Sequence, residues 1–250
     1  MKYLRKNCIL FLTACVDPKG MGQTMLQDKV VRLQQYIEAI RFYLSNTSYP
    51  ILVVENTNYD FSEHFKDELS KGRIECLTFD GNNFDKSLGK GYGEGLIINY
   101  AFKHSKILCN YNYIIKISGR HKLLNLHSIV CASELFLSKN NNNIVINELN
   151  PTRRFARSDM FIASKSFYQN YLNREVTRCN DSDNVWFENV LYDCTLQSIR
   201  NGFEYLYIPF ALDQRGCSGT GGTAFPKTRF RQKLHFFLNM ILYKLGLRSI

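Results

Sequence analysis

The chain has 250 residues, of which 45% are hydrophobic and 22% are charged. This composition excludes a disordered protein, a collagen-like repeat and a small disulfide scaffold. The formal net charge is +10, and residues 227–250 contain six basic residues and no acidic one. A basic chain usually binds a polyanion, and because this basic tail is also rich in large apolar residues, it favours an anionic membrane over a nucleic acid.

The first half of the chain alternates between predicted strands and predicted helices. Residues 8–16 form an apolar run that predicts a buried strand, and residues 27–44 carry apolar side chains at helical spacing. Three further strands and a helix are predicted at 51–54, 74–79, 113–117 and 94–106. Because the order is β-α-β-β-α-β, we expect an α/β fold, with an open, mostly parallel sheet flanked by helices.

The second half is less regular. Short strands are predicted at 144–146, 160–163 and 203–209, and a helix at 186–199. Since no linker or repeat interrupts the chain, we expect one domain over 1–226, with halves at 1–120 and 121–226, followed by a tail at 227–250. In that tail, apolar residues at helical spacing predict an amphipathic helix that either packs on the domain or lies on a membrane: Phe230, Leu234, Phe237, Leu238, Ile241 and Leu245.

The N-terminus imitates a secretion signal. Basic residues precede an apolar run that ends in Leu12-Thr13-Ala14-Cys15, which is similar to a lipoprotein cleavage box. The run is short and no Ser/Gly tether follows, so a buried first strand is favoured. None of the eight cysteines has the spacing of a zinc or redox motif, so we expect reduced thiols in a cytosolic protein. No apolar stretch is long enough to span a bilayer.

Unusual polar residues follow the predicted strands, where ligands of open α/β sheets bind. Thr13 ends the first strand, and Glu55 and Asn56 follow the second. A carboxylate or amide there can accept hydrogen bonds from a base or a ribose, although both residue types are also common in turns. Lys116 and Arg120 flank the end of the fourth strand, where cationic side chains can bind phosphate or form an ordinary basic surface.

The sequence Gly89-Lys90-Gly91-Tyr92-Gly93-Glu94-Gly95 is the strongest local signal. Glycines let the backbone approach a ligand closely, and a helix that follows them offers N–H groups to an anion. The spacing is that of neither a Walker loop nor a dinucleotide-binding turn. A flexible loop without function is the alternative.

One carboxylate is a candidate general base. Glu188 lies at the start of the predicted helix at 186–199, where a carboxylate that faces a cleft can accept a proton. More often such a residue is simply solvated. Asp181-Ser182-Asp183 lies just upstream, and His121 and His127 have a spacing that is weak evidence for a metal site.

Together these motifs resemble a group of bacterial capsule and O-antigen glycosyltransferases of GT-A type. The resemblance covers most of residues 8–225. It rests on Leu12-Thr13-Ala14, Asp17-Pro18, Arg32 to Tyr36, Val54 to Asp60, Gly89 to Glu94 and Lys116 to Arg120, and it continues through Asp159 to Ala163, Trp186-Phe187-Glu188 and Ser218 to Gly221.

The resemblance implies a GT-A-like sheet with an acceptor half, and the transfer of a sugar from a nucleotide diphosphate to a lipid-linked or growing surface polysaccharide. Glu55 and Asn56 would lie near the base or ribose, and Lys90, Lys116 and Arg120 would face the diphosphate. The full expected donor site is Thr13, Glu55, Asn56, Lys90, Gly91, Glu94, Lys116 and Arg120, with Glu188 and Arg120 as catalytic residues.

The sequence departs from the family at its metal motif. Many GT-A enzymes hold a divalent ion through Asp-x-Asp after the fourth strand, where this chain has Lys116-Ile117-Ser118-Gly119-Arg120. We therefore expect no cofactor, with cationic side chains neutralising the leaving diphosphate. Mg²⁺ or Mn²⁺ is possible but not favoured, and Asp181-Ser182-Asp183 is the fallback metal site.

The resulting hypothesis is a metal-independent glycosyltransferase, cytoplasmic and peripheral on the inner face of a bacterial membrane through residues 227–250, with no nucleic acid partner. The alternatives are a nucleotidyltransferase that acts on a sugar phosphate, a nucleic-acid-binding module and a lipoprotein cleaved at Cys15. The donor sugar, the acceptor and the stereochemistry stay open.

Overall fold

The computed structural model describes residues 4–138, 141–217, 223 and 230–245, with the backbone alone for 230–233 and 243–244. Its centre is a seven-stranded sheet with the order β10-β6-β9-β4-β1-β2-β3. Six of the strands are mutually parallel, whereas β9 runs antiparallel to both of its neighbours. The strands are β1 (Cys8–Ala14), β2 (Ile51–Glu55), β3 (Ile74–Thr78), β4 (Tyr113–Ser118), β6 (Ile144–Asn147), β9 (Met160–Ser164) and β10 (Glu204–Tyr207). The prediction of an open, mostly parallel α/β sheet is confirmed.

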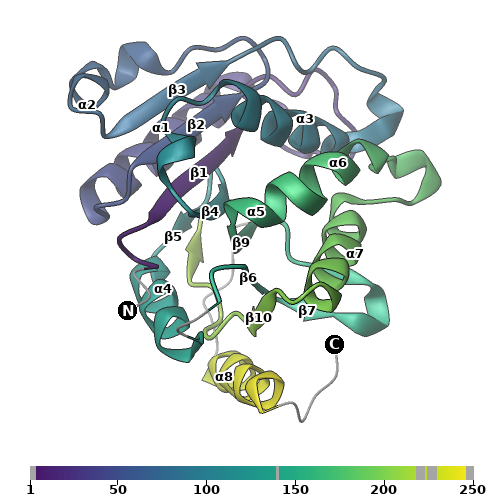
Figure 1. Cartoon of the computed structure of the whole chain (residues 1–250). Helices are drawn as coiled ribbons and strands as arrows, with labels where there is room; N and C mark the ends of the chain where they lie inside the picture. The colour runs from purple at the N-terminus through teal and green to yellow at the C-terminus, as the bar shows by residue number, and fades with distance from the viewer. Residues whose placement is uncertain (1–3, 139–140, 218–222, 224–229, 246–250) are drawn as a thin grey trace.

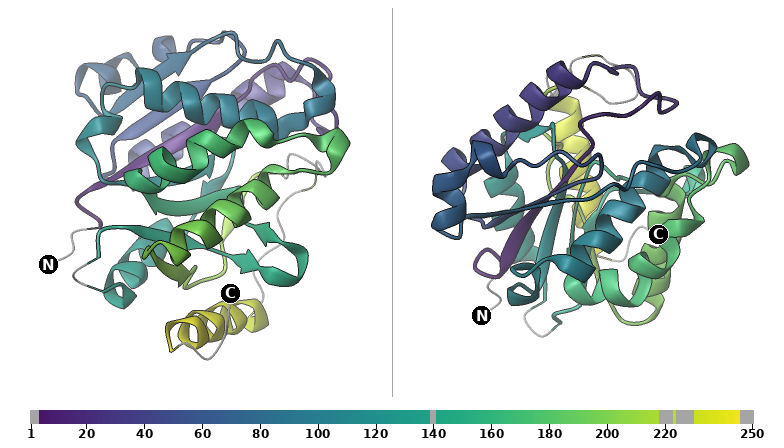
Figure 2. Two further views of the ribbon diagram at one scale, coloured as in Figure 1. Left: turned by 45° about the vertical axis from the view of Figure 1, so that its right-hand side comes forward. Right: turned by 90° about the horizontal axis from the view of Figure 1, so that it is seen from above.

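Helices cover both faces of the sheet (Figures 1 and 2). One face carries α1 (Lys29–Asn46), α4 (Leu126–Phe136) and α8 (Phe230–Lys244). The other carries α3 (Gly89–His104), α7 (Phe187–Arg200) and a helical stretch made of α5 (Lys165–Phe167), a π-helical turn (Tyr168–Leu172) and α6 (Asn173–Glu175). The short helix α2 (Lys66–Ser70) precedes β3, and two small ladders pair β5 (Lys122–Leu123) with β11 (Gln214–Arg215) and β7 (Leu149–Asn150) with β8 (Phe155–Ala156).

The central strands are continuous apolar runs because both of their faces are covered. In β1, Leu10 and Leu12 belong to the core beneath α1, α4 and α8, whereas Ile9 and Phe11 belong to the core beneath α3 and α7. Cys8, the first residue of β1, is buried, and all eight cysteines are free thiols. The first apolar run is therefore a core strand, as the sequence predicts.

The reversal of β9 brings the second half of the chain to the edge of the sheet at which the parallel strands end. Since β9 is antiparallel to β4, with Ile117 opposite Met160, the residues just before β9 lie beside the residues that follow β4. Ser118 N–H donates to Asp159 O at 2.9 Å across this edge. Side chains from both halves of the chain are thus placed at the carboxyl ends of the parallel strands.

The tail forms the predicted helix, but its buried side chains are not among the apolar residues expected to form one face. In α8, Phe236 and Met240 are buried against the sheet, and the Phe236 ring lies 5.6 Å from that of Tyr207 in β10. Leu234, Phe237 and Leu238 are exposed on the outer side. The helix therefore packs on the domain and still presents apolar side chains outward. No helix among the described residues has the length and apolarity to span a membrane.

Candidate functional site

A cavity of about 680 Å³ opens at the carboxyl ends of β1, β2 and β4. Its first wall comes from residues 13–15, loop residues between 18 and 24, Asn56 and Asn82. Its second wall comes from residues between 153 and 159 and between 181 and 189, and α3 and the residues after β4 lie between the two walls. The cavity is thus formed by segments that are far apart in the sequence.

Most of the expected site residues meet in this cavity. Those that line it are Thr13, Asn56, Lys90, Gly91, Glu94, Arg120 and Glu188. Glu55 and Lys116 are not among the described residues that line it, and both side chains are completely buried. These two side chains therefore do not lie in direct contact with a ligand in the cavity.

The carboxylate of Glu55 organises the loops around the cavity. It accepts backbone N–H groups from Val16 at 2.9 Å, Thr57 at 2.7 Å and Tyr59 at 2.9 Å, and the hydroxyls of Thr57 and Thr78. A buried carboxylate with this many donors has no lone pair left for a ribose. Glu55 fixes the segments after β1 and β2, so its expected contact with the donor is replaced by a structural role.

Lys116 lies beneath the cavity as half of a buried ion pair. Its ammonium pairs with the carboxylate of Glu94, donates to Ser158 O at 2.5 Å and lies 5.9 Å from the ring centre of Phe187. Thr13 Oγ1 donates to the same Glu94 oxygen at 3.2 Å. Lys116 thus contacts Glu94 and the second wall and has no exposed surface for the diphosphate contact that the sequence predicts.

The glycine-rich segment is the first part of α3 rather than a loop before it, since the helix begins at Gly89 and not at Glu94. A Cβ on Gly91 would lie 3.0 Å from Phe187 Cβ, and one on Gly95 would lie 2.8 Å from Val176 Cβ. Gly89 has a φ of 82°, and a Cβ there would overlap the carboxylate of Asp181. The glycines thus allow α3 to pack closely on the second wall.

Asn56 lines the cavity and has a buried side-chain oxygen without a partner among the described residues. The side chain is 2% exposed, and the oxygen is Oδ1. Its backbone is fixed, because Asn56 N–H donates to Ala14 O at 3.2 Å and Gly81 N–H donates to Asn56 O at 3.0 Å. A buried polar atom without a partner costs free energy unless a ligand or water satisfies it, so this oxygen marks a position for a donor group of a ligand.

Two expected cations line the cavity in different settings. Arg120 is 7% exposed, donates from Nη1 to Gln35 Oε1 at 2.8 Å and lies 6.0 Å from the ring centre of Tyr36. That bond uses one of the five N–H groups of the guanidinium. Lys90 lies on the exposed side of the first turn of α3. A fixed guanidinium and an extended ammonium suit an anionic ligand.

Carboxylates gather on the second wall. Glu188, in the first turn of α7, accepts a hydrogen bond from Ser158 Oγ at 2.7 Å. Asp181 lines the cavity nearby, and burial raises its pKa, helped by the charge of Glu188 and opposed by that of Lys90. Both carboxylates lie where a hydroxyl that enters along this wall would meet them.

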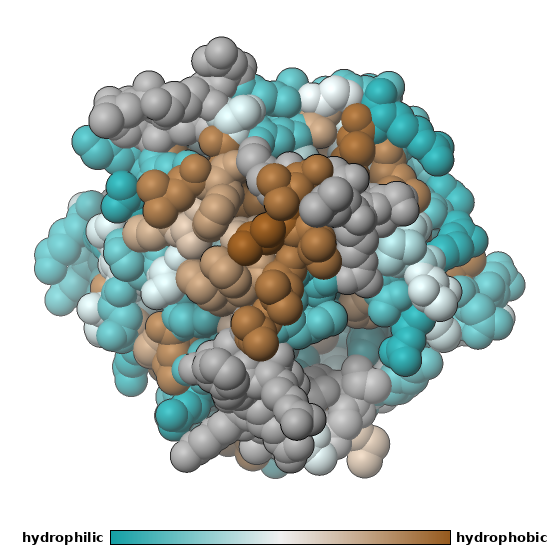
Figure 3. All heavy atoms as spheres, turned by 90° about the horizontal axis from the view of Figure 1, so that it is seen from below, coloured by the Kyte–Doolittle hydropathy of each residue, from teal (hydrophilic) through white to brown (hydrophobic). Residues whose placement is uncertain are grey.

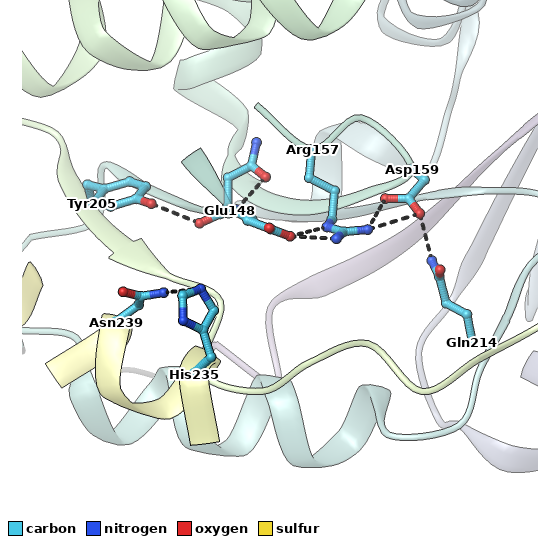
Figure 4. Close-up of polar contacts among 8 residues, drawn as sticks. Glu148, Arg157, Asp159, Tyr205, Gln214, His235 and Asn239 are labelled. Atoms are coloured by element: carbon cyan, nitrogen blue, oxygen red, sulfur yellow. Dashed lines mark hydrogen bonds and ion pairs between the residues drawn. The ribbon is translucent and has the colours of Figure 1, made fainter. Parts of the chain in front are cut away.

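Arg157 fixes the second wall through a network that includes residues shown in Figure 4. Its guanidinium donates from Nε to Glu148 Oε2 at 2.6 Å and from Nη1 to Asp159 Oδ1 at 3.2 Å. Gln214 Nε2 in β11 donates to Asp159 Oδ2 at 2.9 Å. Burial alone would raise the pKa of Asp159, but the charges of Arg157 and His121 and the two hydrogen bonds outweigh it and lower that pKa.

His121 lies at the edge of this network. Burial lowers its pKa to about 4, because the charges of Arg120 and Lys116 add to desolvation and outweigh the attraction of Asp159. The side chain is 6% exposed. His121 is therefore neutral at pH 7.

The two aspartates of the fallback metal site lie in different settings. Asp181 lines the cavity, whereas Asp183 is exposed and accepts a hydrogen bond from Asn180 Nδ2 at 2.8 Å. Within residues 4–138, 141–217, 223 and 230–245, no three His, Cys, Asp or Glu side chains form a group that suits a metal ion. The loop Ser218 to Gly221 lies outside the described residues.

Sequence reasoning missed part of the second wall. Arg157, Asp159 and Trp186 line the cavity, and Arg157 and Asp159 lie just before an antiparallel strand. In a parallel sheet only the ends of strands reach this edge, but the reversal of β9 places the start of a strand there as well. The signal available in the sequence was the charged triplet Arg157-Ser158-Asp159 directly before an apolar run.

No protein-family model and no curated protein matches the sequence. Solved structures that are similar to it include the mannosyltransferase Ktr4p from S. cerevisiae, with 10% identity, coverage of 96% of this chain and 83% of that chain, and a TM-score of 0.49. A cytidylyltransferase from Leptospira borgpetersenii has 15% identity, coverage of 83% and 77%, and a TM-score of 0.45. The bifunctional glycosyltransferase WbbM has 13% identity, coverage of 96% and 45%, and a TM-score of 0.45. With every quoted TM-score below 0.5, function has to be inferred from the site.

Proposed function

We propose that the chain is a glycosyltransferase that moves a sugar from a nucleotide-diphosphate donor to a lipid-linked or growing surface polysaccharide. The observation that carries the proposal is the meeting, in one cavity, of an unpartnered amide oxygen, two cations and a carboxylate: Asn56, Arg120, Lys90 and Glu188. Each of these groups matches one part of the reaction. The cavity also lies at the sheet edge where α/β proteins bind nucleotides.

The donor would lie along the first wall and α3. Asn56 Oδ1 accepts an N–H from the nucleobase, while Arg120 and Lys90 contact the diphosphate. As the bond from the anomeric carbon to the phosphate oxygen breaks, its electron pair stays with the nucleoside diphosphate. The two cations stabilise the negative charge that grows there.

The acceptor would approach from the second wall. Its hydroxyl oxygen forms the new bond to the anomeric carbon, and Glu188 takes the hydroxyl proton. Ser158 Oγ, 2.7 Å from Glu188, orients the carboxylate for this step. Glu188 has this role in a reaction that inverts the anomeric centre; in one that retains it, Glu188 only positions the substrate.

The test of the donor site is a thermal-shift screen with UDP, GDP, CDP and dTDP sugars. We expect one nucleotide class to stabilise the chain, and Lys90→Gln to weaken its binding about tenfold, as the loss of one charge-assisted contact predicts. Lys103→Gln is the control, because Lys103 is an exposed lysine on the same helix outside the cavity lining. Equal effects of the two variants would contradict the assignment.

The test of the chemistry is Glu188→Gln. We expect turnover to fall by about 10²–10⁴, the usual contribution of a general base, with unchanged binding of the donor. Near-normal turnover would remove Glu188 from that role. Release of pyrophosphate from a nucleoside triphosphate and a sugar phosphate would instead identify a nucleotidyltransferase.

Attachment to the inner face of a membrane through residues 227–250 is part of the same proposal. Leu234 is 47% exposed, Phe237 39% and Leu238 48%, and hydrophobic residues gather on the face shown in Figure 3. The six basic residues of the tail would attract an anionic leaflet with about 1 kcal/mol each. This surface suits shallow insertion rather than spanning.

Co-sedimentation with vesicles tests the attachment. We expect binding to vesicles that contain phosphatidylglycerol, and a marked loss of binding in Leu238→Glu. Leu135→Glu is the control, since Leu135 is 83% exposed on α4. Binding that both variants retain in full would refute insertion through α8.

A further inference from the structure

The cavity has a large aromatic side chain at its rim. Trp186 is the single tryptophan of the chain, and it is 44% exposed. Among the exposed large apolar side chains of the described residues, it is the one that lines the cavity. A large apolar surface left in contact with water inside a concave site is typical of a ligand-binding position.

The backbone that carries Trp186 is held on two sides. Asn189 Oδ1 accepts from Trp186 N–H at 3.1 Å, and Asn189 Nδ2 donates to Arg154 O at 2.9 Å. The next residue, Phe187, is buried against Gly91 of α3. This arrangement ties the start of α7 to the β7–β8 hairpin, so the rim is formed before a ligand binds.

We propose that Trp186 is the stacking platform for a pyranose ring of the acceptor, with Phe155 of β8 as a second aromatic contact. The inference rests on the proposed function and names the acceptor's binding position. A pyranose has an apolar face of C–H groups and a polar edge of hydroxyls. An indole offers the broad apolar surface that such a face needs, and both aromatic residues line the second wall.

The position of Trp186 assigns it to the acceptor rather than to the nucleobase. Trp186 and Glu188 are two residues apart, so their Cα atoms are at most about 7 Å apart. Since both side chains also line the same cavity, we infer that a sugar stacked on Trp186 presents its hydroxyl edge toward the expected base. The unpartnered oxygen of Asn56, which suits a base N–H, lies on the first wall instead.

Because Trp186 is the only tryptophan, its fluorescence reports this position without interference. The full chain is first titrated with UDP, GDP, CDP and dTDP, and then, with the best of them at saturation, with methyl glycosides of glucose, galactose, mannose and rhamnose. We expect at least one methyl glycoside to shift the indole emission to the blue in a saturable way, and the nucleotide alone to leave the emission maximum unchanged.

Saturation-transfer NMR with the same methyl glycoside tests three variants. Trp186→Ala should weaken binding about tenfold or more, and Trp186→Phe should retain most of it, because a phenyl ring still stacks. Leu135→Ala, which removes an apolar side chain that is 83% exposed outside the cavity lining, should have no effect. Nucleotide binding should be the same in all three variants.

The outcomes separate this inference from the proposed function. If a nucleotide binds but no methyl glycoside moves the emission, or if Trp186→Ala binds the sugar normally, the platform is refuted and the donor site stands. A nucleotide that shifts the emission and loses affinity in Trp186→Ala would assign Trp186 to the base and overturn the inference. The absence of any nucleotide binding would count against the proposed function itself.

Discussion

The ion pair between Lys116 and Glu94 allows a direct test of how the site is supported. The perturbation is Lys116→Met, which keeps the length of the side chain and removes its charge. Lys116 has no exposed side-chain surface, whereas Glu94 is 23% exposed toward the cavity. Removal of one partner from a buried pair typically costs about 3–5 kcal/mol, mostly because the remaining charge is left uncompensated.

The two single variants should differ because their remaining charges differ in exposure. In Lys116→Met, the carboxylate of Glu94 can be hydrated through the cavity, so we expect a loss near the lower limit, about 3 kcal/mol. For a chain of this length, that loss lowers the melting temperature by about 6–12 °C. In Glu94→Gln, the ammonium remains with no exposed surface, so the loss should approach about 5 kcal/mol.

Urea unfolding at pH 7, followed by circular dichroism, measures these losses. The double variant should cost about 2–3 kcal/mol less than the sum of the two single losses, because it leaves no buried charge alone. Lys122→Met is the control: Lys122 pairs with Glu38 at 2.8 Å, but both side chains are partly exposed, and such pairs contribute about 0–1 kcal/mol. A stable Lys116→Met variant with weakened donor binding would refute the structural role and restore the direct diphosphate contact.

Three further predictions follow from the same site. The folded pKa of His121, about 4, is below its unfolded value of 6.5, so the contribution of His121 to stability is present above pH 6.5 and is lost as the pH falls toward 4, by about 3 kcal/mol in total. His121→Gln should therefore make the free energy of unfolding in urea less dependent on pH between 6.5 and 4. An unchanged pH dependence would contradict this prediction. Gly95→Ala should destabilise the chain by about 1 kcal/mol in urea, because overpacking against Val176 exceeds the gain in helix propensity, whereas Gly22→Ala, with nothing within 4 Å, should be neutral. Stabilisation by the donor should persist in EDTA, since Arg120 and Lys90 replace a metal in the proposed mechanism; loss of the thermal shift with chelator would refute metal independence.

Much of the fold could be predicted from local patterns. The apolar runs predict β1 and β2, because a sheet covered on both faces needs uninterrupted apolar strands. The helical spacing of apolar residues predicts α1. The reversal of β9 could not be predicted in this way. Strand direction depends on which partner lies beside the strand, and the apolar pattern of β9 fits a parallel and an antiparallel strand equally well.

The site residues also differ in how far their role could be predicted from the sequence. Asn56, Lys90 and Arg120 could be found because they follow strands or open a helix, which are positions that the chain order reveals. Glu55 and Lys116 have the same kind of position in the sequence, yet they are completely buried. The difference arises from side-chain direction: one residue along a strand changes the face on which a side chain lies, and only the packed structure shows which polar group already has its partners.

The glycines of α3 connect these observations. Their position before a predicted helix indicates anion binding, but the structure uses them for contact between two halves of the chain. Gly89, Gly91 and Gly95 lie against Asp181, Phe187 and Val176 respectively, so α3 packs directly on the segments that carry the second wall. The same helix carries Lys90 and Glu94 into the cavity. A side chain at Gly91 would push Phe187 outward, and Trp186 and Glu188 with it. The close approach of α3 therefore sets the distance between the group that would hold the acceptor and the groups that would hold the diphosphate.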